Sequence, residues 1–383
     1  MVDVSVVKCN DYDIFNVKRS LKKSFDLIGG IGKFVKKDES VLLKCNLLAS
    51  AKKERAVTTH PAFVEALIIL LRESGIRKIA IGDSPGLESA EQVAKSVGLY
   101  EVCKKNKVEI IDLKTSGTKV SEKNRRIKRF TLAKELDNFD RIINLPKMKT
   151  HSLTVFTGAV KNLFGCVPGR VKAGFHVRLQ HPLEFSDMLI DLYDTIKPDL
   201  SIMDAIVGME GNGPYSGIPK KVGLILASEN AIALDRIACS IFSLKNVPLF
   251  KAALSRGIKE SVMDNIDIKG ENLKDVSLKE VKHAKISIIT KLPSFITKTF
   301  QKILFRYPSV NACNCISCGK CKKMCPADAI KIEPEEKTDK KVPHFDYRKC
   351  IRCYCCHEIC PKEAIVLKKP LLLKIYYLFH RDD

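Results

Sequence analysis

The sequence predicts an α/β protein with a mostly parallel sheet covered by helices on both faces, followed by a small cysteine-rich domain. Two observations predict this organisation. Residues 1–285 alternate short apolar runs with amphipathic segments, whereas residues 309–369 contain two cysteine-rich runs of equal spacing. Apolar strands separated by amphipathic helices are typical of a parallel sheet that is buried on both faces. The 383 residues of the chain are enough for two or three domains.

The strands predicted in the first domain are short and apolar. In chain order they occupy residues 4–8, 40–46, 76–84, 141–146, 200–207 and 221–228. Helical periodicity predicts helices at residues 16–27, 60–75, 88–98, 184–196 and 231–242. The second of these has Pro61 in its first turn and Gly75 at its end, which are common helix start and stop signals. The basic run RRIKR (125–129) continues as RIKRFTLA, whose alternation predicts an exposed strand.

The C-terminal domain contains the same cysteine run twice. Each run has the spacing C-x2-C-x2-C-x3-C-P, which is the run of bacterial ferredoxins. The first comprises Cys315, Cys318, Cys321, Cys325 and Pro326, and the second Cys350, Cys353, Cys356, Cys360 and Pro361. A constant offset of 35 residues also aligns Ile316 with Ile351, Ala329 with Ala364 and Ile330 with Ile365, which indicates an internal repeat. Cys313 and Cys355 fall outside the spacing and are predicted to be spare.

This spacing predicts two [4Fe–4S] clusters in a two-cluster ferredoxin-type (α+β) domain. Three cysteines of a run can hold one cubane from a tight turn, and the fourth, before proline, ligates the other cluster in two-cluster ferredoxins. The predicted ligands are therefore Cys315, Cys318, Cys321 and Cys360 for cluster 1, and Cys350, Cys353, Cys356 and Cys325 for cluster 2. Zinc is the alternative for CxxC pairs, but it needs four ligands from two pairs, whereas each run supplies four cysteines. A disulfide framework is not expected without a secretory signal.

The chain has 66 basic and 44 acidic residues and a formal net charge of +22. The basic residues are spread along the chain, as on a solvated basic surface, but this charge also favours an anionic small-molecule substrate or an acidic redox partner protein. Nucleic acid is a less favoured partner, because the sequence has no known nucleic-acid motif. The chain start lacks a signal-peptide pattern and no apolar run is long enough to span a membrane, so we expect a cytoplasmic protein.

Two further segments lie outside the domains. Residues 286–308 are predicted to be a connector with an amphipathic helix around 294–305. The tail, residues 370–383, is short, apolar and weakly basic. We expect the tail to dock against the α/β domain, with peripheral membrane contact as the alternative.

Three stretches that follow predicted strands combine glycines with charged residues. They are NLPKMKTHSLTVFTGAVKNLFGCVPG (144–169), GDSPG (82–86) and DAIVGMEGNGP (204–214). Ligands of open α/β sheets bind at the carboxyl ends of strands, and glycine-rich backbone together with lysine suits an anion. We therefore predict an anion site made by Lys147, Lys149, His151, Lys161, Gly208, Gly211 and Gly213, close to Asp83 and Asp204.

His151 is the candidate catalytic residue of this site, because an imidazole with a pKa near neutrality can donate a proton to a ligand that is reduced. The alternative is that these residues only cap helices and lie in solvated loops. THP (59–61), which precedes the second predicted helix, is expected to be a helix cap. GGIGKF (29–34) is not a P-loop, because Leu27 and Phe34 stand where that motif needs Gly and Ser/Thr.

The sequence resembles the proteins built on domain of unknown function 362, which often carry a C-terminal two-cluster ferredoxin module. The matching stretches are LLKCN, TTHP, GDSPG, PKMKTHSLTVFTGAVKNLFG and DAIVGMEGNGP. Two departures are KCN (44–46), where Lys-Pro-Asn is expected, and SENAIALD (228–235), where an Asp usually replaces Glu229 or Asn230. Cys45 is then either a site thiol or a small buried residue, and we favour burial. The resemblance implies the domain pairing and iron–sulfur binding, and it supplies no reaction.

The leading hypothesis is an iron–sulfur redox protein, and an oxidoreductase is one form of it. Its clusters would pass electrons to a ligand held by the α/β domain or to a partner protein, because two cubanes in one module suit a relay. The alternative is a non-redox enzyme or binding module for an anionic ligand, with clusters that stabilise or sense. A nucleic-acid-binding protein is the third hypothesis and rests on charge alone.

Overall fold

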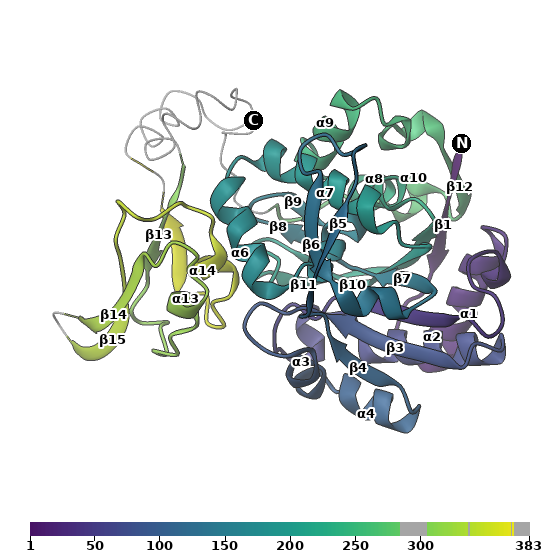
Figure 1. Cartoon of the computed structure of the whole chain (residues 1–383), viewed down its shortest axis with the longest axis horizontal. Coiled ribbons are helices and arrows are strands. Elements are labelled where there is room, and N and C mark those ends of the chain that lie inside the picture. The colour runs from purple at the N-terminus through teal and green to yellow at the C-terminus, as the bar shows by residue number, and fades with distance from the viewer. Residues whose placement is uncertain (284–304, 336–337, 369, 371–383) are drawn as a thin grey trace.

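The computed structural model describes residues 1–283, 305–335, 338–368 and 370. It consists of an α/β domain and a smaller C-terminal part, residues 305–368, which we call the cysteine module; the two lie side by side (Figure 1). Most of the predicted connector and nearly all of the predicted tail, residues 286–304 and 371–383, lie outside the described residues.

One mixed sheet forms the centre of the α/β domain, with the strand order β12-β1-β11-β10-β7-β2-β3-β4. Its strands are β1 (Val2–Lys8), β2 (Ser40–Cys45), β3 (Lys78–Asp83), β4 (Glu109–Asp112), β7 (Arg141–Leu145), β10 (Leu200–Glu210), β11 (Ile218–Ser228) and β12 (Ile266–Gly270). Neighbours from β10 to β4 pair in parallel, as do β12 and β1, whereas β11 runs antiparallel to β1 and β10. The prediction of a mostly parallel sheet is therefore confirmed.

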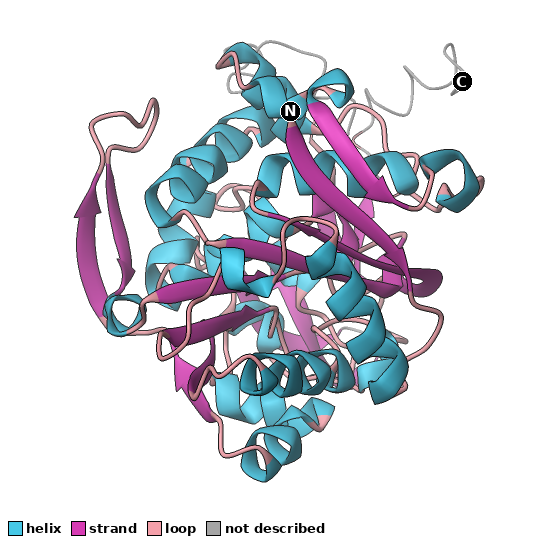
Figure 2. Ribbon diagram, turned by 90° about the vertical axis from the view of Figure 1, so that its right-hand side faces the viewer, coloured by secondary structure: helices cyan, strands magenta, loops and turns pink. Residues whose placement is uncertain are grey.

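Helices cover both faces of this sheet (Figure 2). They are α1 (Ile14–Asp26), α2 (Pro61–Glu73), α3 (Ala90–Val97), α4 (Leu99–Lys105), α5 (Ala159–Asn162), α6 (Gly169–Arg178), α7 (Pro182–Ile196), α8 (Ala231–Ile241), α9 (Pro248–Ser255) and α10 (Leu273–Val276). Successive side chains of a strand point to opposite faces, so β2 gives Val41 and Leu43 to the core under α1–α4 and Leu42 to the core under α5–α9. Cys45 is fully buried in the first of these cores, as the burial interpretation expects.

The structure corrects the prediction that the stretches 144–169 and 204–214 are strand-end loops. Residues Lys147–His151 form a strand, β8, which makes a hairpin with β9 (Val155–Thr157) and also pairs with β10. β10 continues to Glu210, so Asp204 and Gly208 lie within a strand. The long pairing of β10 with β11, which reaches Glu210 opposite Ile218, extends this strand beyond its apolar part. In GDSPG (82–86), Gly82 and Asp83 are the last two residues of β3, and residues 84–86 follow the strand, so this stretch does lie at a strand end as predicted.

The prediction of an exposed strand at residues 126–133 is only partly correct, because the strand begins at Arg129, the last residue of the basic run, and three of its five residues are buried. β5 (Ser116–Val120) and β6 (Arg129–Ala133) form a separate two-stranded sheet in which Phe130 is fully buried and Arg129 is exposed. The backbone N–H groups of Arg125, Arg126 and Ile127 donate to the Asp191 carboxylate. The run is therefore anchored to α7.

The described residues of the cysteine module form two short helices and two small sheets. Its elements are β13 (Tyr307–Val310), α13 (Lys320–Lys323), β14 (Ile330–Glu335), β15 (Thr338–Phe345), α14 (Cys355–Glu358) and β16 (Ile365–Lys368). β13 pairs with β16 and β14 with β15, both antiparallel. The two repeats thus each supply one short helix and lie as neighbours, since α13 packs against α14.

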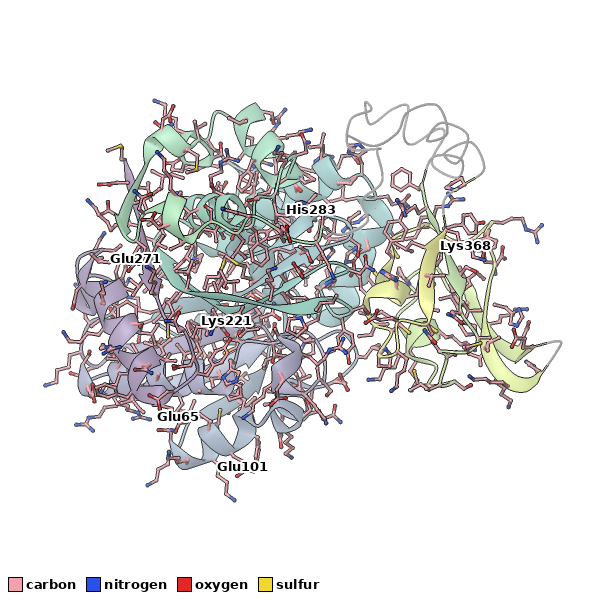
Figure 3. All side chains as sticks on the ribbon, turned by 180° about the vertical axis from the view of Figure 1, so that it is seen from behind. Glu65, Glu101, Lys221, Glu271, His283 and Lys368 are labelled. Carbon is pink, nitrogen blue, oxygen red and sulfur yellow. The ribbon has the colours of Figure 1, made fainter. Side chains whose placement is uncertain are left out.

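Side chains of the two parts meet along a junction (Figure 3). Ile359 and Met324 of the module pack with Met209 and Tyr215 of the α/β domain. Polar contacts add to this: Ser216 Oγ donates to the carbonyl of Cys360 at 3.4 Å, and Lys320 lies 3.5 Å from a Glu88 carboxylate oxygen. In the described part of the chain, no helix is long and apolar enough to cross a membrane.

Candidate functional site

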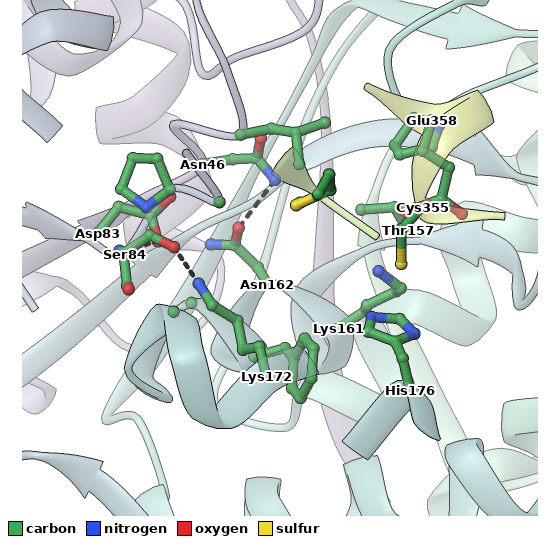
Figure 4. A pocket seen from close by; sticks show the side chains of 18 of the residues that line it. Asn46, Asp83, Ser84, Thr157, Lys161, Asn162, Lys172, His176, Cys355 and Glu358 are labelled. Carbon is green, nitrogen blue, oxygen red and sulfur yellow. Dashed lines mark hydrogen bonds between the residues drawn. The ribbon is translucent and has the colours of Figure 1, made fainter. Parts of the chain in front are cut away.

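A cavity lies at the junction of the α/β domain and the cysteine module (Figure 4). It has about 910 Å³ of empty space, part of which is open to solvent. The α/β domain contributes Asn46, Asp83, Ser84, Lys149, Thr157, Lys161, Asn162, Phe164, Lys172 and His176 to its wall, and the module contributes Met324, Pro326, Cys355 and Glu358. The wall is therefore charged on one side and carries a thiol and a carboxyl group on the other.

The short helix α5 brings Lys161 and Asn162 to the cavity. Its N-terminus is fixed by the buried carboxylate of Asp235, which accepts from the backbone N–H groups of Ala159 at 2.5 Å and Val160 at 3.0 Å. Gly158 makes this contact possible, because a Cβ there would lie 2.0 Å from Asp235 Oδ1. Burial raises the pKa of Asp235 to about 7, against the effect of these two hydrogen bonds.

Asparagine side chains link the wall to the sheet. Asn162 Nδ2 donates to Asn144 Oδ1 at 2.8 Å and to the carbonyl of Lys44 at 3.1 Å. Asn46 Nδ2 in turn donates to Asn162 Oδ1 at 3.0 Å. Because each amide orients the next, this network holds the floor of the cavity in one arrangement.

Asp83 lines the cavity as an already neutralised group. Lys44 Nζ lies 2.8 Å from Asp83 Oδ1, and both side chains are buried. The backbone N–H groups of Leu47 and Ser84 also donate to the carboxylate, at 2.6 and 2.8 Å. Asp83 therefore offers little free negative charge to the cavity.

Three further lysines line the cavity with few acidic partners. Lys149 Nζ donates to the carbonyl of Val57 at 2.7 Å and to Asn46 Oδ1 at 3.1 Å, and Lys172 Nζ donates to the carbonyl of Ser84. Among the described residues, Lys161 makes no side-chain hydrogen bond or ion pair within bonding distance. Burial lowers the pKa of all three, to about 8 for Lys172 and well below the usual range for Lys149.

His151 lies behind this wall and contacts Glu358 of the module. Its Nδ1 accepts from the backbone N–H groups of Leu153 and Thr154, at 3.0 and 3.3 Å, while its Nε2 lies 3.5 Å from Glu358 Oε1. Burial lowers the pKa of His151 well below its usual value and raises that of Glu358 to about 7. A neutral imidazole is therefore the form that the structure favours.

Several buried polar atoms at the cavity have no hydrogen-bond partner within the described residues. They are Thr157 Oγ1, His176 Nδ1, His151 Nε2 and Glu358 Oε1. Buried polar atoms nearly always have a partner, and leaving one without costs about 1–3 kcal/mol. His151 Nε2 lies behind the cavity wall and faces Glu358 Oε1 at 3.5 Å, whereas Thr157 and His176 line the cavity itself. The unpartnered atoms of Thr157 and His176 therefore mark the cavity as a place that is built for polar contacts.

The structure does not place all of the predicted anion-site residues together. Lys149, Lys161 and Asp83 line the cavity and His151 lies next to it, whereas Lys147, Asp204 and the three glycines do not line it. Lys147 Nζ instead bonds to Asp204 Oδ2 and to the hydroxyl of Tyr12, both at 2.7 Å.

The glycine backbone is also occupied. The N–H of Gly211 donates to the carbonyl of Lys282 at 2.7 Å, and that of Gly213 to the carbonyl of Gly211 at 2.9 Å. Gly208 lies in the ladder between β10 and β11, opposite Lys220. His60 confirms the expected cap: its Nδ1 accepts from the N–H of Ala62 at 3.2 Å at the start of α2.

Sequence reasoning missed Lys172, His176, Thr157 and Glu358. A signal was present for the first two, since they are four residues apart and share a face of α6. Thr157 and Glu358 carry no such signal, because they meet only through the junction.

The eight predicted cluster ligands surround two separate cavities in the module. Cys315, Cys318, Cys321 and Cys360 line one, and Cys325, Cys350, Cys353 and Cys356 line the other. Each cavity therefore takes three cysteines from one run and the Cys-Pro cysteine from the other. Among the described residues, no group of three or more His, Cys, Asp or Glu side chains is positioned so that it could hold a single metal ion.

Cys355, which the spacing leaves out, lies between the second of these sets and the junction cavity. Its side chain is buried and lines the junction cavity, and in the sequence it lies between the predicted ligands Cys353 and Cys356. Cys313 is exposed. The two spare cysteines thus occupy different surroundings.

An α/β domain joined to a cysteine module that surrounds two cavities with cysteines defines an iron–sulfur protein of a two-domain type. The model of a 4Fe-4S dicluster domain matches residues 314–364, and that of domain of unknown function 362 (DUF362) matches residues 41–240. The chain belongs to the DUF362 family, as the resemblance implied.

The chain is similar to a curated bacterial protein and, more distantly, to solved structures. The chain is 38% identical over 242 residues to the thylakoid-associated protein sll1697 of Synechocystis sp., a match of 63% of this chain and 74% of the relative. A Thermotoga maritima crystal structure matches with a TM-score of 0.40 and 14% identity over 62% of this chain and 60% of that one. The lactate racemase apoprotein of Thermoanaerobacterium thermosaccharolyticum matches with a TM-score of 0.41 and 12% identity over 63% and 57%. This chain thus spans less than two thirds of either solved structure.

Proposed function

We propose that this protein is an iron–sulfur oxidoreductase that holds an anionic small molecule in the junction cavity, next to the cysteine module. The observation that carries the proposal is that one cavity is lined both by lysines of the α/β domain and by Cys355, the neighbour of a predicted cluster ligand. A ligand there would contact the ligand-binding and the redox part of the chain at once.

The cysteines fit two [4Fe–4S] clusters. Four cysteines surround each cavity, and each set combines both repeats. Cys315, Cys318, Cys321 and Cys360 would hold one cluster, and Cys350, Cys353, Cys356 and Cys325 the other. When bound, such clusters supply or accept single electrons at low potential.

The charge of the cavity supports an anionic ligand. Lys149, Lys161 and Lys172 face it, Asp83 is compensated by Lys44, and the burial of Glu358 favours its neutral form. Lys149 is fully buried, and Lys161 and Lys172 are partly buried. Ammonium groups in such surroundings without equal negative charge are costly, which is why burial lowers the pKa of each. A carboxylate or phosphate would restore their charge balance and accept charge-assisted hydrogen bonds.

The residues of the wall have separable roles in this proposal. Lys161 and Lys172 bind the anion, and Asn46 and Asn162 orient it. Phe164 and Met324 exclude water from part of the cavity. His151 and Glu358 are 3.5 Å apart and can hold or move a proton for a ligand that gains electrons.

The cluster assignment can be tested by pairs of cysteine variants. Reconstituted protein should contain about eight irons per chain, and Cys313→Ala or Cys355→Ala should keep that number. If the sets are crossed, Cys325→Ala combined with Cys350→Ala removes ligands of one cluster only and leaves about four irons. Cys325→Ala combined with Cys315→Ala should remove both clusters. The reverse pattern of iron contents would show that each run holds its own cluster.

The ligand site can be tested on protein purified without oxygen. Small molecules released by denaturation should include an anion, identified by mass spectrometry, in the wild-type protein. Lys161→Met and Lys172→Met should each retain about 10- to 100-fold less of it, as expected for a lost charge-assisted hydrogen bond. The exposed Lys104→Met is the matched control, and iron content should be equal in all four proteins.

The outcomes separate the alternatives. A ligand that is consumed when reductant is supplied supports the oxidoreductase. A ligand that is bound equally in oxidised and reduced protein and is never consumed supports a binding module with sensing or stabilising clusters. Equal retention in the cavity variants and in Lys104→Met would contradict the site.

A further inference from the structure

The two repeats of the cysteine module differ at the positions between their cysteines. With the offset of 35 residues, Ser317 corresponds to Arg352 and Gly319 to Tyr354. The first repeat therefore has small residues beside Cys318, where the second has large ones beside Cys353. The two sets of cysteines therefore differ in how far neighbouring side chains cover them.

The end of the module formed by the second repeat is covered, and we call it the covered end. Tyr354 is 5% exposed, packs with Phe305, and donates from its hydroxyl to the carbonyl of Arg306 at 3.1 Å. The Arg352 guanidinium donates to the carbonyl of Phe305, and Arg352 is itself buried. With these contacts Cys353 is only partly exposed, whereas its counterpart Cys318 in the first repeat is exposed.

The end formed by the first repeat is open, and we call it the open end. Ile316 is 54% exposed, and Ser317 and Cys318 are exposed beside it. All three line the same cavity as Cys315, Cys321 and Cys360. An exposed aliphatic residue beside an exposed thiol is a surface that another molecule can reach within contact distance of the first cysteine set.

The rim of the open end is basic. Lys362 lines the same cavity and is exposed. Lys341 is exposed, and its carbonyl accepts from Ser317 Oγ at 2.5 Å. Lys340 Nζ reaches the carbonyl of Ala312 at 2.7 Å. A small apolar centre with a cationic rim is complementary to an acidic protein surface with an apolar centre of its own.

From this asymmetry we propose that the open end is the docking site of an acidic one-electron carrier protein. The inference rests on the cysteine sets assigned under the proposed function, but not on the ligand of the junction cavity. One electron is exchanged per encounter, so the carrier is oxidised by one electron as the module is reduced by one, and no bond is made or broken. The junction cavity and the open end then serve different partners.

The surface predicts a short-lived complex. Transient redox complexes are small and are held together largely by charge, so their affinity falls steeply with salt. Changing two rim lysines to glutamate lowers the charge of the rim by four units. The same charge change at the covered end leaves the charge of the rim unchanged.

The test measures binding of the holoprotein to an acidic [2Fe–2S] ferredoxin by anaerobic calorimetry at low and at high salt. Lys341→Glu combined with Lys362→Glu should weaken binding by about tenfold or more at low salt and remove most of the salt dependence. Arg348→Glu combined with Lys349→Glu, both exposed near the covered end, is the matched control and should bind like the wild type. Equal weakening by both pairs, or none by the first, would overturn the proposal.

A second readout separates docking from damage to the module. Reduction of the bound clusters by methyl viologen radical, a small cation that needs no docking site, should be no slower than in the wild type in either double variant. Reduction by the ferredoxin should slow only in the rim variant. Because neither measurement involves a ligand in the junction cavity, the docking site stands or falls independently of the oxidoreductase activity.

Discussion

Lys147 and Lys161 are both cations in the interior of the protein, but their surroundings differ. Lys147 Nζ bonds to Asp204 and Tyr12, both at 2.7 Å, and Tyr12 donates to the other oxygen of Asp204 at 2.8 Å. The backbone N–H of His60 completes the set, with 3.0 Å to Asp204 Oδ2. Lys161 has no such partner in the described chain and faces the junction cavity together with Lys172. A charge with partners stabilises the fold, whereas a charge without them is available to a ligand.

The first prediction concerns Lys147→Met, which removes the cation from the paired group and should lower stability more than the other lysine substitutions. Lys147→Met leaves the buried carboxylate of Asp204 without its cation, and removing one partner of a buried ion pair costs about 3–5 kcal/mol. The midpoint of thermal unfolding should fall by roughly 5–15 °C, measured by calorimetry on the holoprotein. Lys161→Met is the matched control, because it removes a partly buried charge that has no hydrogen-bonded acidic partner in the described chain, and its midpoint should stay the same or rise.

Equal destabilisation by these two variants would show that the described contacts do not distinguish the lysines. A further variant sharpens the comparison: Asp204→Asn keeps the shape of the side chain and removes only its charge. It should destabilise the protein, and combined with Lys147→Met the loss should be less than the sum of the single losses, because both disrupt one pair.

Much of the fold is visible in the sequence because its signals are local. The periodicity of residues 60–75 and the cap at His60 predict α2, and the apolar run at 40–46 predicts β2. β8 is the instructive failure: Lys147, Lys149 and His151 in a row of five residues suggest a loop, yet all three are buried. The ammonium groups of Lys147 and Lys149 find partners on other elements, and such partners cannot be seen in a local pattern.

The junction site was partly visible from the sequence. Lys149 and Lys161 were predicted to share a site, and the structure places both on one wall, but it gives Lys147 to a separate network. The module's share of the site, Cys355 and Glu358, lies about two hundred residues further along the chain. Cys355 was recognisable only as a cysteine that the ferredoxin spacing does not use, and its place beside the cavity follows from the packing of two domains.

The last prediction concerns Lys172, the cavity lysine whose pKa burial lowers to about 8. In the unfolded chain its pKa is about 10.4. Between these values the unfolded chain binds a proton that the folded protein does not, so Lys172 makes the stability rise with pH across this window. Lys172→Met lacks this contribution. The unfolding midpoint of the wild type relative to this variant should therefore increase from about pH 8 to about pH 10. The effect should be smaller than that of Lys147→Met, because solvent partly reaches Lys172. A difference that stays flat over this range, with Lys104→Met as the exposed control, would show that Lys172 keeps an ordinary pKa in the folded protein.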